Sequence, residues 1–272
     1  MSLENIVKQE TNKMGRISKE NYSRVMVTSD YHIPFHDEES INVMLDYAND
    51  YKPDKFYING DFLDFYSIST FDKNPERKEN LQTEIYKGRE VLANIRDSVK
   101  KSTEIIFLKG NHEDRLQRFL YKNPGLYGLD VLSMDSLLDF KKYGVKLIGS
   151  DIDYWAKHKG TTDEGDMVIG HGGTTQGFKY SQYSGYGEKN TVQKIHSNVC
   201  MGHSHRLAKH YQTDYQGNVL VGLNSGCLCM NPGYAWQKGF VTFEKIGDKT
   251  TNHKVINIES GKLFQNGKIY SR

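Results

Sequence analysis

Short apolar runs alternate with longer amphipathic stretches along the first 110 residues. Residues 24–29 and 55–59 form two such runs and a third run ends at Gly110, and each has the length of a buried strand. Between the first two runs, residues 38–51 carry apolar side chains at helical spacing, and residues 79–101 have the composition and spacing of a longer helix. This alternation predicts a largely parallel sheet whose functional loops gather at the carboxyl ends of its strands.

The pattern changes after the third run. It predicts helices over residues 112–121 and 134–143, and strands over residues 145–148 and 166–169. Further strands follow without clear intervening helices, at residues 218–223, 239–244 and 253–258. We therefore expect an α/β fold in which the later strands form a second, mixed or antiparallel sheet that packs on the first.

Composition and charge narrow the class of protein. The 272 residues are expected to form one domain, residues 24–272, after a polar N-terminal arm, residues 1–23. Lys and Arg total 36 against 34 Asp and Glu, and a net charge of +2 gives no strong field to recruit nucleic acid or anionic membrane. No apolar stretch approaches the roughly 18 to 20 residues of a membrane span, and no secretory signal is evident. We expect a soluble, cytoplasmic protein without a membrane partner.

The three cysteines, Cys200, Cys227 and Cys229, are too few for a disulfide framework, and none forms a C-x-x-C pair. They are typical of small, reduced, buried side chains. Cys227 and Cys229 alternate after Gly226, a spacing that favours packing from a strand over metal binding.

Polar side chains follow five apolar runs, at the point where each predicted strand ends. They are Asp30, His32, Asp61, Asn111, His112, His171, His203 and His205. Residues two apart, such as Asp30 and His32, point the same way from an extended segment and can bind a common ligand. Imidazole and carboxylate together suit Mn²⁺, Fe or Zn²⁺ better than Ca²⁺. The donors exceed the need of one tetrahedral ion, so we expect two ions, with Asp61 as the bridge.

These blocks resemble the ordered signature of the calcineurin-like metallophosphoesterase superfamily. The resemblance covers residues 30–205 and includes Gly60–Asp64, Gly110–Glu113 and Gly202–His205. It implies a four-layer αββα sandwich of two mixed β-sheets flanked by helices. Asp64 is followed by Phe65 and not by the Arg-Gly of the phosphoprotein phosphatase branch. Residues 110–116, 226–229 and 236–240 are more similar to a group of small phosphoesterases encoded by bacteriophages and bacteria.

The resemblance also implies roles for the residues that match its motifs. One ion would take Asp30, His32, Asp61 and His205, and the other would take Asp61, Asn111, His171 and His203. His112 would be a catalytic residue that faces the substrate and protonates the leaving oxygen or stabilises the charged transition state. The expected ions are Mn²⁺ with Fe, Zn²⁺ and Ni²⁺ as alternatives. They would supply a bound hydroxide for in-line attack, since they lower the pKa of bound water to about 7.

Four further residues are weaker candidates. We expect Glu113 to orient the His112 imidazole, whereas Asp64 either supports a ligand or caps a turn or helix. Arg115 either meets substrate phosphate or lies on a solvated helix face, as does Arg118. His36 lies either at the pocket rim or in an exposed loop. The Tyr- and Gly-rich residues 180–187 form either a base-stacking segment or an ordinary surface loop.

The predicted function is hydrolysis of a phosphodiester or phosphomonoester of nucleotide type. One alternative is a DNA nuclease resembling the Mre11/SbcD type, which needs a basic track for DNA. Another is a metal-binding scaffold without turnover, against which the intact ligand set argues. The natural substrate and the oligomeric state stay open.

Overall fold

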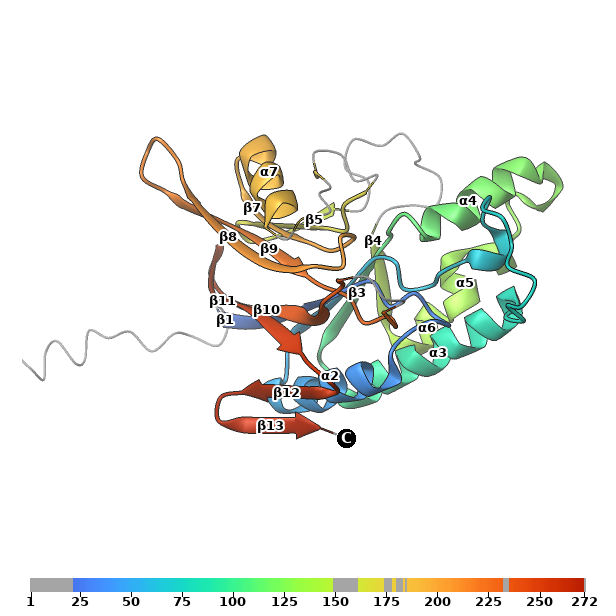
Figure 1. Cartoon of the computed structure of the whole chain (residues 1–272), viewed down its shortest axis with the longest axis horizontal. Coiled ribbons are helices and arrows are strands. Elements are labelled where there is room, and N and C mark those ends of the chain that lie inside the picture. Colours follow the sequence, from blue (N-terminus) through green and yellow to red (C-terminus); the bar gives the residue numbers. More distant parts are fainter. Residues whose placement is uncertain are drawn as a thin grey trace, which may run out of the picture.

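Two sheets and two sets of helices stack in four layers (Figure 1). The computed structural model describes residues 22–148, 161–173, 178, 179, 183, 185–231 and 235–271. The larger sheet has the strand order β11 (Lys249–Ile258), β10 (Lys238–Ile246), β1 (Tyr22–Thr28), β2 (Lys55–Asn59), β3 (Glu104–Leu108), β4 (Val145–Ile148). The smaller sheet has the order β5 (Thr161–Glu164), β6 (Met167–Gly170), β7 (Asn198–Met201), β9 (Val219–Ser225), β8 (Leu207–Thr213).

Helices cover the outer face of each sheet. Beneath the larger sheet lie α2 (Glu38–Tyr51), α3 (Leu81–Ser98), α5 (Met134–Leu138) and α6 (Phe140–Tyr143). The smaller sheet is covered by α7 (Tyr186–Ile195), and α4 (Glu113–Lys122) projects beyond the carboxyl end of β3. Three short 3-10 helices, η1 (Tyr66–Ile68), η2 (Pro124–Leu126) and η3 (Asp130–Leu132), and the hairpin of β12 (Lys262–Gln265) and β13 (Lys268–Ser271) complete the fold. The predicted αββα sandwich is confirmed.

Alternating side chains of the larger sheet feed two separate cores. Val25 and Val27 of β1 face the smaller sheet, whereas Met26 between them packs among the helices. In the same way, Tyr57 of β2 belongs to the core between the sheets and its neighbour Phe56 to the helical core. This period of two is what a strand buried on both faces requires.

A buried ion-pair network ties the two sheets together away from their carboxyl edge. The Glu164 carboxylate on β5 accepts hydrogen bonds from Lys55 Nζ and Tyr57 Oη on β2, each at 2.6 Å, and Lys245 Nζ lies 2.8 Å from its other oxygen. Burial opposes ionisation of Glu164, but the two ammonium groups hold its pKa below the usual range. The network therefore links β2 and β10 of the larger sheet to β5 of the smaller sheet.

The predicted strands and helices of residues 24–59 and 104–122 are confirmed to within a few residues. The parallel pairing of β1, β2 and β3 is confirmed as well, and β4 extends this parallel part of the sheet. The predicted helix over residues 134–143 divides into α5 and α6, because Asp139 adopts a left-handed conformation with a φ of 54°. The predicted helix over residues 79–101 is shorter at both ends. The Asn80 side chain caps its amino end by accepting from Thr83 N at 3.0 Å, and at its carboxyl end Val99 is already extended.

One expectation about the second sheet was wrong. Strands β10 and β11 belong to the larger sheet, where β10 pairs antiparallel with β1 and covers an edge that would otherwise be open. The prediction also missed β5, β8, α7 and the terminal hairpin. Residues 1–21 of the predicted arm and residues 180–182 and 184 of the Tyr- and Gly-rich segment lie outside the described residues, whereas Tyr186 begins α7. Among the described residues, no helix has the length and apolar character that a bilayer crossing needs.

Candidate metal centre

Loops that follow β1, β2, β3, β6 and β7 place the predicted polar side chains together. These strands run parallel within their sheets, so their carboxyl ends open on one edge of the sandwich. Atoms of the two sets touch across the sheets: Asp30 Oδ1 lies 3.1 Å from His205 Nε2, and Asp61 Oδ2 lies 3.1 Å from His171 Nε2. The site therefore draws on both sheets.

The backbone of these loops is held in an unusual conformation. Five non-glycine residues of the site have a positive φ between 50° and 68°: Asp30, His32, Asp61, His203 and His205. Left-handed backbone is uncommon in such residues, and it clusters at functional sites. The expectation that residues two apart converge from an extended segment was wrong. Asp30 and His32, like His203 and His205, converge because their backbone is left-handed.

Two glycines let the loops approach closely. A Cβ on Gly110 would lie 2.2 Å from Asp61 Oδ1, and one on Gly202 would lie 2.6 Å from Asp30 Oδ2. No side chain fits at Gly110 unless Asp61 moves, nor at Gly202 unless Ser29 and Asp30 move. The glycines of the sequence motifs therefore position the carboxylates.

Each aspartate uses one oxygen to bind the protein and turns the other towards histidines. Asp30 Oδ2 accepts from the Ser29 hydroxyl and from His203 N, while Oδ1 faces the imidazoles. Asp61 Oδ1 accepts from His112 N at 2.8 Å, and Oδ2 faces His171. One oxygen of each carboxylate is thus fixed and the other points into the site.

The imidazoles are oriented from behind. His171 donates its Nδ1–H to the carbonyl oxygen of Asn59 at 2.8 Å, which turns Nε2 towards Asp61. The Asp64 Oδ2 lies 3.3 Å from His32 Nδ1, so Asp64 supports this candidate ligand. Such partners fix the tautomer of metal-binding histidines.

The donor set fits a pair of metal ions. Three buried atoms in the site form no well-aligned hydrogen bond among the described residues: Asp30 Oδ1, Asn111 Oδ1 and His171 Nε2. Asp30 Oδ1 and His171 Nε2 make ion-pair contacts, each with its nearest partner at 3.1 Å. Buried polar atoms without a partner are rare in folded proteins, and a coordinated ion supplies one. Candidate metal-binding groups include Asp30, His32 and Asp61 as one set and Asp61, His171 and His203 as another. Asp61 belongs to both sets, as a bridging carboxylate would.

Asn111 and His203 lie on the same side of the site. A Cβ added at Gly173 would meet both, 3.0 Å from Asn111 Oδ1 and 3.0 Å from His203 Cε1. The ring of His203 also lies 5.3 Å from the ring of His171, centroid to centroid. The structure therefore brings together all seven predicted ligands.

The site concentrates charge of both signs. Burial raises the pKa of the Asp61 carboxyl, but the charges of His171 and His112 outweigh it, and the net pKa lies below the usual range. Burial disfavours protonation of His171, yet Asp61 and Asp30 together raise its pKa to about 9. The Asp61 carboxylate is therefore anionic at neutral pH. In the absence of a metal ion its charge favours protonation of His171, and it would equally attract a metal ion.

His112 lies at the rim of this cluster. Its ring contacts that of His32 at 4.3 Å, and Nε2 lies 3.7 Å from Asp61 Oδ2. Its Nδ1 lies 3.0 Å from the Asp64 carbonyl oxygen, and Arg115 Nη2 lies 2.9 Å from its Nε2. Burial lowers the pKa of His112 to about 4, and the neighbouring cations act in the same direction. Arg115, bound also to Asp64 Oδ1 at 3.0 Å, is therefore part of the site.

Glu113 has a different role from the one predicted. No hydrogen bond joins it to the His112 imidazole within the described part of the chain. Its buried carboxylate instead accepts from four backbone N–H groups, those of Gly110, Asp61, Phe62 and Leu63, at 2.7 to 3.1 Å. It therefore holds the loops after β2 and β3 together.

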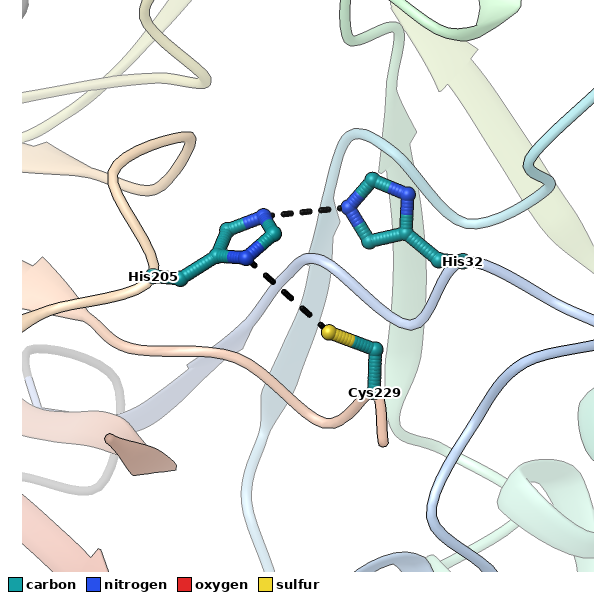
Figure 2. A group of neighbouring side chains, drawn as sticks. All are labelled: His32, His205 and Cys229. Carbon is teal, nitrogen blue, oxygen red and sulfur yellow. Dashed lines mark hydrogen bonds between the residues drawn. The ribbon is translucent and has the colours of Figure 1, made fainter. Parts of the chain in front are cut away.

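Cys229 is a residue of the site that sequence reasoning missed. Its Sγ lies 4.0 Å from His205 Nδ1 and points towards the pair formed by His205 and His32, whose Nε2 atoms are 3.1 Å apart (Figure 2). Cys229 follows β9, which runs parallel to β7, so it arrives at the same edge as the histidines. The signal was an apolar run followed by Gly226, as at the other loops. His36 pairs with Cys229 through the backbone, and it belongs to none of the candidate groups found among the described residues.

Known proteins resemble the chain in sequence. A family model described as calcineurin-like phosphoesterase matches residues 23–207. The chain is 26% identical over 267 residues to the Gene 54 protein of Mycobacterium phage L5, and 26% identical over 264 residues to that of phage D29, covering 91% of this chain and 98% of each relative.

Two solved structures are similar at low identity. A single mutant of Vps29 from Entamoeba histolytica gives a TM-score of 0.44 at 14% identity, over 90% of this chain and 95% of that chain. The purple acid phosphatase PPD1 of yellow lupin gives 0.44 at 13% identity, over 89% and 52%. Because the family model matches more than half of this chain, the chain belongs to the calcineurin-like phosphoesterase family.

Proposed function

We propose that the protein hydrolyses a phosphodiester or phosphomonoester of nucleotide type with the help of two divalent metal ions. The observation that carries the proposal is the position of Asp61, which is shared by two candidate metal-binding groups. Buried atoms of Asp30, Asn111 and His171 that form no hydrogen bond among the described residues are available to bind ions. The set of imidazole, carboxylate and amide donors suits Mn²⁺, with Fe, Zn²⁺ and Ni²⁺ as alternatives.

Bound ions would neutralise phosphate oxygens and supply a nucleophile at neutral pH. The chain's own residues would bind the phosphate and transfer the proton. Arg115 is the side chain best placed to grip a phosphate oxygen, because its guanidinium is fixed by Asp64 beside the cluster. His112 stands next to Arg115, and its low pKa leaves Nε2 without a proton at neutral pH, so it would protonate the leaving oxygen after Nε2 has taken up a proton. In the structure, an N–H of Arg115 points at His112 Nε2. A phosphate oxygen that accepts this N–H would leave His112 Nε2 free.

Hydrolysis of bis(p-nitrophenyl) phosphate by the Mn²⁺-loaded protein tests the proposal. We expect turnover by the wild-type protein and a loss of roughly 100-fold or more in His112→Ala, with its metal content unchanged. Asp61→Asn is the matched control for the metal pair, and it should lose both activity and metal. An inactive wild-type protein with full metal content would favour a scaffold, and unchanged turnover by His112→Ala would refute its catalytic role.

A further inference from the structure

A cavity of about 500 Å³ opens beside the metal centre. Asn111 and Arg115, which belong to the centre, form its inner end. One wall is residues 67–71, at and after η1, and the other is a face of α4 that carries Arg118, Phe119 and Lys122. We call this cavity the α4 groove.

The α4 groove is cationic. Arg115, Arg118 and Lys122 are spaced by three and four residues, so they share one face of α4 and extend over about 10 Å along it. Neither Arg118 nor Lys122 forms an ion pair with any residue that the structure describes, and no described acidic side chain lines the groove. Unpaired cations that line a cavity attract anions, and here the cavity starts at the metal centre.

The groove also offers aromatic surface. Phe71 is 66% exposed, although a large apolar ring is normally covered. The guanidinium of Arg115 lies 5.4 Å from the centre of this ring, so Phe71 connects the groove to the residues beside His112. Phe119 adds a half-buried ring on the facing wall. Exposed aromatic rings among cations are the usual platform for unpaired bases.

We propose that the α4 groove binds the nucleotides that flank the scissile phosphate of a single-stranded polynucleotide, an inference that rests on the phosphoesterase function proposed above. A stacked strand advances about 3.4 Å per nucleotide, so the cationic face of α4 spans about three nucleotides. Stacking on the exposed Phe71 ring requires an unpaired base, which a single strand presents and a duplex does not. A mononucleotide would reach Arg115 but would leave Lys122 without a phosphate.

Binding of labelled oligothymidylates of one, three and six nucleotides to the Mn²⁺-loaded protein tests the inference. Phosphorothioate linkages keep the charge and slow hydrolysis, so fluorescence anisotropy measures affinity whether or not the protein is active. We expect tighter binding of three nucleotides than of one, and little further gain at six. Arg118→Gln and Lys122→Gln should each reduce the slope of log affinity against log salt by about 0.7. Phe71→Ala should weaken binding roughly tenfold.

Two variants far from the groove serve as matched controls. Lys101→Gln removes an exposed cation before the amino end of β3, and Phe264→Ala removes an aromatic ring, 70% exposed, from the terminal hairpin. Affinity that does not depend on length, or groove variants that behave like these controls, would overturn the inference. Hydrolysis of bis(p-nitrophenyl) phosphate is measured separately, so loss of the proposed function and loss of the groove are distinguishable.

Discussion

Replacing Glu113 by glutamine tests how the loops of the metal centre are held. The carboxylate accepts from four buried backbone N–H groups, two on each oxygen. A glutamine oxygen can satisfy two of them, but its amide nitrogen is a donor and leaves the other two without an acceptor. An unsatisfied buried donor costs about 1 to 3 kcal/mol, so Glu113→Gln should lower the free energy of unfolding by roughly 2 to 6 kcal/mol.

Urea unfolding of the metal-free protein, followed by circular dichroism, measures this difference by linear extrapolation. The metal-free form is used because bound ions add their own stabilisation. Glu188→Gln is the matched control, since Glu188 is also buried, accepts from Asn224, and has an Oε2 without a hydrogen-bond partner among the described residues. A loss below about 1 kcal/mol for Glu113→Gln, or one equal to that of the control, would refute the reasoning.

Two other predictions follow from buried groups near the site. Burial raises the pKa of Glu84 to about 8, so the folded protein keeps a proton that the unfolded chain releases near pH 4.3. The free energy of unfolding should therefore fall as pH rises between these values. Glu84→Gln should remove roughly 4 kcal/mol of that fall, which denaturation at pH 5 and pH 8 measures. A wild-type and variant difference that is constant with pH would contradict this. Cys229→Ala removes the sulfur beside His205 Nδ1 and should weaken Mn²⁺ binding about tenfold in calorimetric titration. The control Cys200→Ala, in the core between the sheets, should leave Mn²⁺ affinity unchanged. Equal Mn²⁺ affinities for the two variants would argue against a role for Cys229.

The strand ends of the site were predictable, because at each of them an apolar run is followed directly by a glycine or an aspartate. Asp30, Asp61 and Asn111 were placed correctly at one edge, since parallel strands bring their carboxyl ends together. Their left-handed backbone was not predictable, because it depends on contacts with other loops, such as the one from Asp30 N to the Gly60 carbonyl oxygen.

Contacts between distant segments account for the remaining errors. Glu113 was assigned to its sequence neighbour, although its partners Asp61, Phe62 and Leu63 lie about fifty positions away. Cys229 was assigned to packing, because the order of strands that sets β9 beside β7 is a property of the whole sheet. For the same reason, nothing local in β10 marks it as the partner of β1.

The central claim is that two ions share Asp61. Anomalous scattering from crystals of the Mn²⁺-loaded protein, recorded at the manganese edge, tests it most directly. The account predicts two peaks about 3.5 to 4 Å apart on either side of the Asp61 carboxylate, with Asn111 and His171 next to one and His32 and His205 next to the other. A single peak, or two peaks that do not share Asp61, would contradict it.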